Sequence, residues 1–174
     1  REVTRRMTAL DRDRNENIAL IRDSAAAVAP PGAGLQRVRA LRFGRPGFDR
    51  AVWQQICDMG WPALRVPEAD GGSGLGMQEF CALAEELGAA LVPEPLIPCA
   101  MAARLLAGAP LAQLITGEKI VIAAWQESFN SLATVGATRC IDGRVSGRKR
   151  FVPMADGADA FVVTTADGAV LVQA

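Results

Sequence analysis

The chain has 174 residues, half of them apolar, with 19 basic and 19 acidic side chains. This length suits one ordinary domain or two small ones, and no apolar run approaches the roughly 20 residues of a membrane-spanning helix. Residues 1–50 hold 11 Arg against 6 acids, but the Lys clusters and interleaved aromatics of a nucleic-acid surface are missing. We therefore expect no nucleic-acid partner and no membrane span, and interpret the arginines as a solvated face or a surface that pairs with an acidic partner.

Local patterns predict helices in the first two thirds of the chain. Apolar residues at helical spacing favour a first helix over residues 14–29, which Pro30 and Pro31 would end. Residues 30–47, rich in Gly and Pro, are expected to form an irregular connection. Further helices are predicted over residues 49–59, 77–90, 97–107 and 111–115.

The periodicity changes at Gly117, after which strands are predicted. Asp142 and Gly143 favour a tight hairpin turn, and the expected strands cover residues 119–125, 138–141, 144–146, 149–152, 160–165 and 169–173. Segregated helices and strands favour an α+β fold. We predict an all-α helical domain over residues 1–116, followed by the start of an antiparallel β-barrel or sandwich-like domain over residues 117–174.

Cysteine and histidine usage narrows the chemistry. Cys57, Cys81, Cys99 and Cys140 are widely spaced, so neither a zinc site nor a redox pair is indicated, and no metal is expected. The first three lie in apolar helical contexts, where we expect them buried and reduced, as in a cytoplasmic protein. The chain has no His, which excludes a Ser–His or Cys–His nucleophile carried by this chain alone. The charged start predicts no signal peptide, and we interpret the chain as a fragment.

The most specific motif runs from Gly60 to Gly88. It reads Gly-Trp, Val-Pro-Glu, Gly-Gly-Ser-Gly-Leu-Gly and Glu-Glu-Leu-Gly in that order. Its glycines permit a sharp turn into the next helix. A Rossmann fingerprint is disfavoured because the strand before it would be too short, and a P-loop because no Gly-Lys-Ser/Thr follows. Two further motifs are Thr-Gly-Glu-Lys at residues 116–119 and the run from Asp142 to Asp159.

Together these motifs resemble the N-terminal part of the acyl-CoA dehydrogenase family. The resemblance implies a helical domain, a middle β-domain and a C-terminal four-helix domain, with FAD as cofactor. It implies α,β-dehydrogenation of an acyl-CoA thioester, a homo- or hetero-oligomer, and an electron-accepting flavoprotein as partner. The family's catalytic base is a Glu of the C-terminal domain, which this sequence does not contain. No catalytic residue is therefore assigned, and Glu85 and Glu86 are expected to be solvated or capping partners.

The resemblance also implies where the flavin would lie. The expected cofactor-binding residues fall in two segments. The first holds Trp125, Gln126 and Ser128, and the second holds Phe151, Val152 and Pro153. Ser131, just after the first segment, is the expected substrate-binding residue. Trp125 is expected either to contact the ligand or only to pack, whereas Trp53 and Trp61 are expected to be core or interface anchors.

Both flavin segments depart from the family pattern. Of the family's Thr-Glu-Pro triplet only Glu127 is kept, and no Gly-Ser-Asp follows. Pro153 replaces a Thr and offers neither a hydroxyl nor an N–H. Two hypotheses stay open: an acyl-CoA dehydrogenase, or a degenerate, non-catalytic or half-site subunit of a hetero-oligomeric one. A helical interaction module with an added sheet would explain the composition but not the ordered motif.

Overall fold

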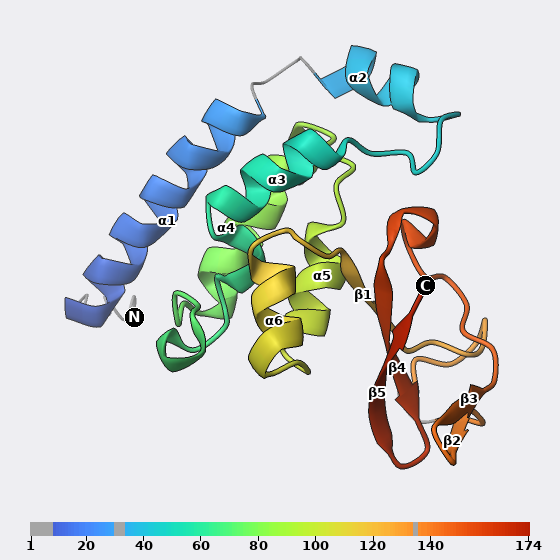
Figure 1. Ribbon diagram of the computed structural model, residues 1–174. Coiled ribbons are helices and arrows are strands. Elements are labelled where there is room, and N and C mark those ends of the chain that lie inside the picture. Colours follow the sequence, from blue (N-terminus) through green and yellow to red (C-terminus); the bar gives the residue numbers. More distant parts are fainter. Residues whose placement is uncertain (1–8, 30–33, 134–135) are drawn as a thin grey trace, which may run out of the picture.

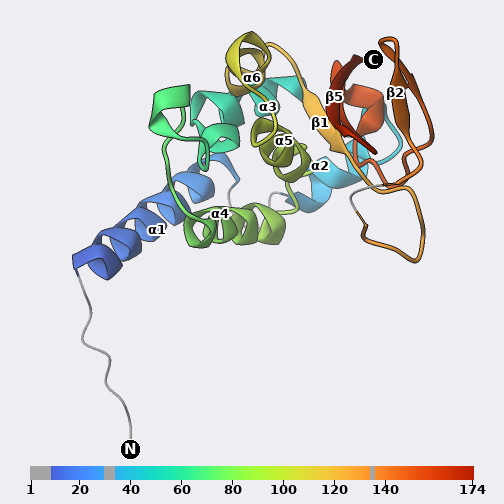
Figure 2. The same ribbon diagram turned by 90° about the horizontal axis from the view of Figure 1, so that it is seen from below.

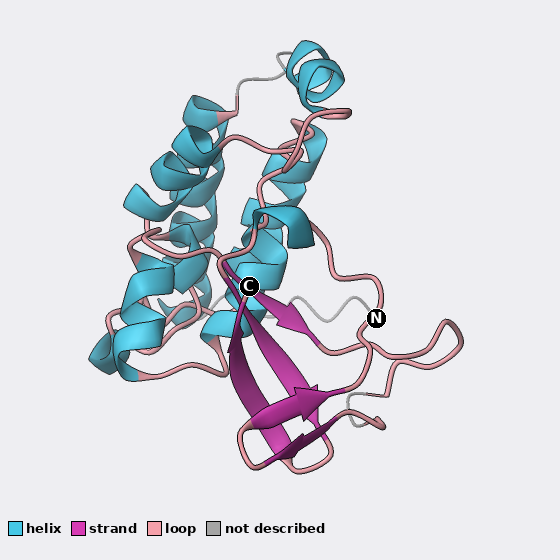
Figure 3. Cartoon of the chain, turned by 45° about the vertical axis from the view of Figure 1, so that its right-hand side comes forward, coloured by secondary structure: helices cyan, strands magenta, loops and turns pink. Residues whose placement is uncertain are grey.

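The computed structural model describes residues 9–29, 34–133 and 136–174 (Figure 1). Helices occupy the first part of the chain and strands the last. Figure 3, coloured by secondary structure, shows that most helices lie on one side of the molecule and the strands on the other. The helices are α1 (Ala9–Val28), α2 (Gly34–Leu41), α3 (Arg50–Asp58), α4 (Met77–Ala89), α5 (Leu96–Ala103) and α6 (Gly108–Ile115). The strands are β1 (Val121–Ala124), β2 (Arg139–Ile141), β3 (Arg144–Ser146), β4 (Ala160–Thr165) and β5 (Gly168–Gln173). Short 3₁₀ turns lie at Trp61–Ala63 (η1), Glu68–Asp70 (η2) and Ala155–Gly157 (η3).

Most predicted helices are confirmed, but several bounds differ. Helix α5 ends at Ala103, so the prediction is wrong for residues 104–107, and α6 begins at Gly108 rather than at residue 111, because the positive φ of Gly108 (57°) interrupts the helical backbone. Helix α1 begins at Ala9 rather than at residue 14, while the change from helix to strand falls between Ile115 and Val121, as predicted. Helix α2 lies inside the segment that we expected to be irregular, so that prediction is wrong for residues 34–41. A tertiary ion pair from Arg37 to the buried Glu94 holds this short helix, and local periodicity could not reveal it. Pro30 and Pro31 lie outside the described residues.

The α+β class is confirmed, and the sheet itself is mixed. Strand β4 pairs antiparallel with β5 and parallel with β1, in the order β1-β4-β5, while β2 and β3 form a separate hairpin (Figure 2). A parallel pair needs a long crossover, which residues 125–159 supply. The described strands do not close into a barrel. The strand predicted over residues 149–152 is not formed, because Phe151 (φ 52°) and Met154 (φ 56°) have left-handed backbone conformations that cannot continue a ladder.

Strand β1 separates two parts of the core. Its side chains alternate, so Ile120 and Ile122 meet one apolar cluster and Val121 and Ala123 meet another. The first cluster contains Trp53 and Trp61, which are 1% and 2% exposed, and this confirms them as buried anchors. Helical residues contribute to both clusters. The division into domains at residue 116 stays a prediction.

The glycine motif is a compact turn. A Cβ on Gly72 would lie 2.1 Å from the carbonyl oxygen of Val66, so the chain packs there backbone against backbone. The N–H of Gly74 donates to the same oxygen at 2.8 Å, and Gly60 (φ 73°) ends α3 with an N–H that donates to Cys57. These glycines bring the chain back along η1 before α4 begins, which is a packing role.

The cysteine prediction is partly corrected. Cys57 and Cys99 are buried, as expected, but Cys81 is exposed because it lies on the outward face of α4, one turn before the exposed Glu85. Burial raises the pKa of Cys57 to about 12, with Asp58 adding to the shift. Across the described helices, none combines the length and apolarity that crossing a membrane would need.

Candidate functional site

The structure brings together the two segments expected to hold the flavin. Residues 125–133 leave the end of β1, and residues 147–154 return toward η3. The backbone N–H of Arg150 donates to the carbonyl oxygen of Gln126 at 2.8 Å. Gln126 and Phe151 are 25 positions apart in the sequence, and the resemblance alone named both as cofactor-binding residues. This hydrogen bond makes their two segments close neighbours in space.

A partly buried ion pair fixes this arrangement. Lys149 Nζ donates to Glu127 Oε1 at 2.8 Å, to the Thr164 hydroxyl at 3.0 Å and to the Trp125 carbonyl at 3.3 Å. The Lys149 and Glu127 side chains are 8% and 18% exposed. Glu127 also accepts from the Thr138 hydroxyl at 2.5 Å and from the N–H groups of Ala137 and Thr138. Glu127 is thus an anchor that ties the end of β1 to the segment before Phe151.

These bonds perturb the titration of Glu127. The hydrogen bond from Lys149, followed by that from the Thr138 hydroxyl, lowers the pKa of Glu127 to about 2. The carboxylate is therefore charged at neutral pH and is not a proton carrier. Sequence reasoning matched Glu127 to the family triplet but gave it no role. It also missed Lys149. The available signal was its place in the Gly-Arg-Lys part of the motif that runs from Asp142 to Asp159.

Two aromatic rings project beside this anchor. Phe129 and Phe151 form an edge-to-face pair with ring centres 5.0 Å apart, and Arg150 Cζ lies 4.7 Å from the Phe129 ring centre. The two rings remain 67% and 60% exposed. Exposed aromatic faces next to a guanidinium can stack against a planar ring system.

Two exposed serines lie in the same loop. Ser128 Oγ accepts from the N–H of Asn130 at 3.2 Å, and Ser131 Oγ accepts from the N–H of Ala133 at 3.1 Å. Each hydroxyl keeps a proton that it can donate to a bound group. The Gln126 side-chain amide instead donates to the Ser128 carbonyl at 3.0 Å.

The remaining predicted residues point in different directions. Trp125 is half-buried and, with Ala123 and Leu132, lines a cavity of about 710 Å³ against the end of α5 and the β4–β5 turn. Val152 packs against the opposite cluster, the one that contains Ile122. The Trp125 side chain therefore lies on the other face of β1 from Val152, and only its backbone joins the anchor.

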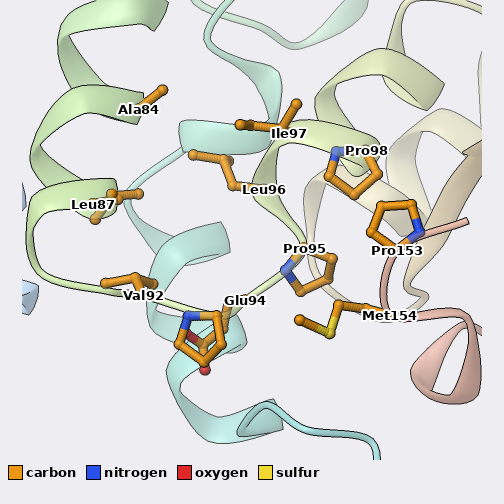
Figure 4. A pocket seen from close by; sticks show the side chains of 12 residues that line it. Ala84, Leu87, Val92, Glu94, Pro95, Leu96, Ile97, Pro98, Pro153 and Met154 are labelled. Atoms are coloured by element: carbon orange, nitrogen blue, oxygen red, sulfur yellow. The ribbon is translucent and has the colours of Figure 1, made fainter. Parts of the chain in front are cut away.

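Pro153 lines a second, smaller cavity of about 170 Å³ (Figure 4). Leu87 and Ala84 of α4 form one side, the proline-rich segment of residues 92–98 forms another, and Pro153 and Met154 form the third. Sequence reasoning did not predict this cavity, because its walls come from three separate parts of the chain.

Comparison with known proteins identifies the family. Residues 16–118 match the family described as acyl-CoA dehydrogenase, N-terminal domain. The chain belongs to the acyl-CoA dehydrogenase family. It is 35% identical over 120 residues to the acyl-CoA dehydrogenase IpdE2 of Mycolicibacterium smegmatis, covering 66% of this chain and 39% of that protein. It is 29% identical over 162 residues to benzylmalonyl-CoA dehydrogenase of Aromatoleum aromaticum, covering 82% and 40%.

Solved structures share the fold. The Tcur3481-Tcur3483 steroid ACAD G363A variant matches with a TM-score of 0.71 and 30% identity, over 94% of this chain and 48% of that one. The ChsE4-ChsE5 complex from Mycobacterium tuberculosis matches with a TM-score of 0.70 and 25% identity, over 92% and 46%. The chain thus spans less than half the length of these relatives.

The side chains of the candidate site suit a flavin ring in part. Phe129 and Phe151 offer exposed aromatic faces, and Ser128 and Ser131 offer hydroxyl protons. Pro153 can offer no hydrogen bond from its side chain or its nitrogen. The residues present therefore fit FAD through stacking and through the serines, with one donor fewer than a Thr at position 153 would give.

Proposed function

We propose that the protein is a FAD-dependent dehydrogenase that introduces an α,β double bond into an acyl-CoA thioester. The observation that carries the proposal is the Lys149–Glu127 anchor, which holds the two expected flavin segments together. Pro153, in the second of these segments, lines an apolar cavity. In this proposal the following residues contact FAD: Gln126, Ser128, Phe151, Val152 and Pro153, with Trp125 through its backbone. Ser131 would contact the substrate.

Each part of the chain then has a definite task. When bound, the flavin supplies the acceptor for the hydride that leaves the β-carbon. Phe151 stacks against a ring, the anchor fixes the loop, and the smaller cavity takes the acyl group away from water. The base that removes the α-proton is assigned outside this chain. Glu85 and Glu86 both pair with Arg22 of α1, so neither is available for that role.

The proposed partners follow from the family. They are an acyl-CoA substrate, an electron-accepting flavoprotein and further subunits of the same or another chain. We also propose a cytoplasmic location, as expected from the cysteines. The division into a helical domain and a β-domain belongs to the same proposal.

A second candidate is a degenerate, non-catalytic or half-site subunit of a hetero-oligomeric acyl-CoA dehydrogenase. Pro153 and the missing Gly-Ser-Asp favour it, and a relative of similar fold, ChsE4-ChsE5, is described as a complex. In that role, the exposed Phe129 and Phe151 would meet another subunit instead of an isoalloxazine ring.

The test is an anaerobic absorption measurement on the whole protein loaded with FAD. Adding acyl-CoA should bleach the visible flavin band, and Phe151→Ala should weaken FAD binding. Phe43→Ala is the matched control, because Phe43 is also an exposed phenylalanine, but belongs to the loop after α2. The proposed enzyme role is wrong if acyl-CoA does not bleach the flavin band of the protein alone and bleaches it only after a second, different subunit is added.

A further inference from the structure

The smaller cavity has a stiff, apolar wall. Pro93, Pro95 and Pro98 all line it, and Ile97 lies at its rim with 54% of its surface exposed (Figure 4). Proline fixes its own φ and has no N–H, so this wall neither adapts easily nor offers donors. Opposite it, Leu87 and Ala84 come from α4, a helix held against the core by the fully buried Leu83.

Glu94 supplies the only charge among the described residues that line the cavity. Its side chain is 0% exposed and is paired with Arg37 of α2, whose Nη1 donates to Glu94 Oε2 at 3.1 Å. The backbone N–H of Asp49 donates to Glu94 Oε1 at 3.1 Å. The charge is therefore already matched, and a ligand that displaced this pair would leave a buried carboxylate without its partner, which is strongly unfavourable.

The volume sets the size of the occupant. A dry protein cavity of about 150 Å³ takes up one benzene molecule, and this cavity measures about 170 Å³. A fused four-ring skeleton is much larger than benzene and does not fit in a cavity of this volume. A six-membered ring, or a chain of about six carbons, fills a cavity of this volume.

We propose that this cavity limits the acyl group to one six-membered ring or about six carbons, and that the proline-rich segment around Glu94 forms its inner wall. The proposal rests on the proposed function, since it names the substrate class of the same site. It sets this chain apart from a relative named as a steroid dehydrogenase and brings it nearer to one named for a benzylmalonyl thioester.

The cavity can be tested without flavin or CoA. Binding of benzene and of phenanthrene to the protein is measured by ligand-observed NMR. Benzene should bind and phenanthrene should not, and Ala84→Phe, which fills the cavity, should abolish benzene binding. Ala89→Phe is the control, because Ala89 is exposed on the same helix and does not line the cavity. Equal binding of both hydrocarbons, or benzene binding that survives Ala84→Phe, overturns the size limit.

The substrate class is tested with acyl-pantetheine thioesters of four, six, eight and ten carbons. Affinity should rise about fourfold per buried methylene up to six carbons and then stop rising. Leu87→Ala, which removes part of the apolar wall, should extend the rise by roughly two to three carbons. A steady rise to ten carbons in the wild-type protein contradicts the proposal. If benzene binds as expected and no thioester binds, the size limit stands and the proposed function fails.

Discussion

Replacing Lys149 with Met tests the anchor beneath the candidate flavin site. The substitution keeps most of the side-chain volume but removes the charge and the donors to Glu127, Thr164 and Trp125. Exposed ion pairs contribute about 0–1 kcal/mol, whereas breaking a fully buried pair costs about 3–5 kcal/mol. This pair lies between those limits, at 8% and 18% exposed, and Glu127 keeps the donors of Ala137 and Thr138. We therefore expect a loss of about 2 kcal/mol at neutral pH.

The pH dependence gives an independent signature. The folded protein holds the pKa of Glu127 at about 2, below its ordinary value of 4.5. A depressed carboxyl pKa contributes stability that is present above the ordinary value and is lost as the pH falls toward the folded value. The wild-type protein should thus lose this contribution between pH 4.5 and pH 2. Lys149→Met should lose most of that dependence, because the principal cause of the shift is gone.

Urea unfolding at pH 7 and pH 3 measures both effects. Arg148→Met is the control, since Arg148 is the exposed neighbour of Lys149 in the same segment. A Lys149→Met variant as stable as Arg148→Met at both pH values would refute the structural role given to the pair.

Three other predictions concern the packing of glycines, the reactivity of thiols and the core side of α4. Thermal unfolding should show that Gly72→Ala destabilises the fold by more than about 2 kcal/mol, because its Cβ would lie 2.1 Å from the Val66 carbonyl oxygen. Gly88→Ala is the matched control. It has no atom near its Cβ and should stabilise α4 by about 0.5–1 kcal/mol. A disulfide reagent should modify the exposed Cys81 first, and Cys81→Ser should remove that fast phase; fast reaction of Cys57 or Cys99 would contradict their burial. Leu83→Ala, at a fully buried position of α4, should cost about 3 kcal/mol in urea unfolding, and a cost under 1 kcal/mol would show that the core is looser than described.

The fold was predictable where the evidence is local. Periodicity located the long helices, and the Asp142–Gly143 turn located the β2–β3 hairpin. Helix α2 was missed because its ion pair to Glu94 joins residues 57 positions apart. The parallel pairing of β1 with β4 was missed for a similar reason, since pairing across a long crossover leaves no mark on either strand's own pattern.

The candidate site was predictable only in outline. The resemblance selected Gln126, Ser128 and Phe151, which the structure places together around the anchor. It could not show that the Trp125 side chain faces the opposite cavity, because that follows from the alternation along β1. A phenylalanine at position 151 also does not indicate a left-handed backbone conformation, which is what prevents the expected strand.

Equilibrium FAD binding, compared between the wild-type protein and Pro153→Thr, tests the assignment of the flavin wall most directly. If residues 151–153 face the ring, Pro153 withholds a hydrogen bond worth about 1 kcal/mol net, so the wild-type protein should bind FAD weakly. Pro153→Thr should then raise the affinity by about fivefold, and by up to roughly tenfold for a stronger bond. Tight, stoichiometric FAD in the wild-type protein, unchanged in Pro153→Thr, would contradict the assignment and show that other contacts hold the flavin.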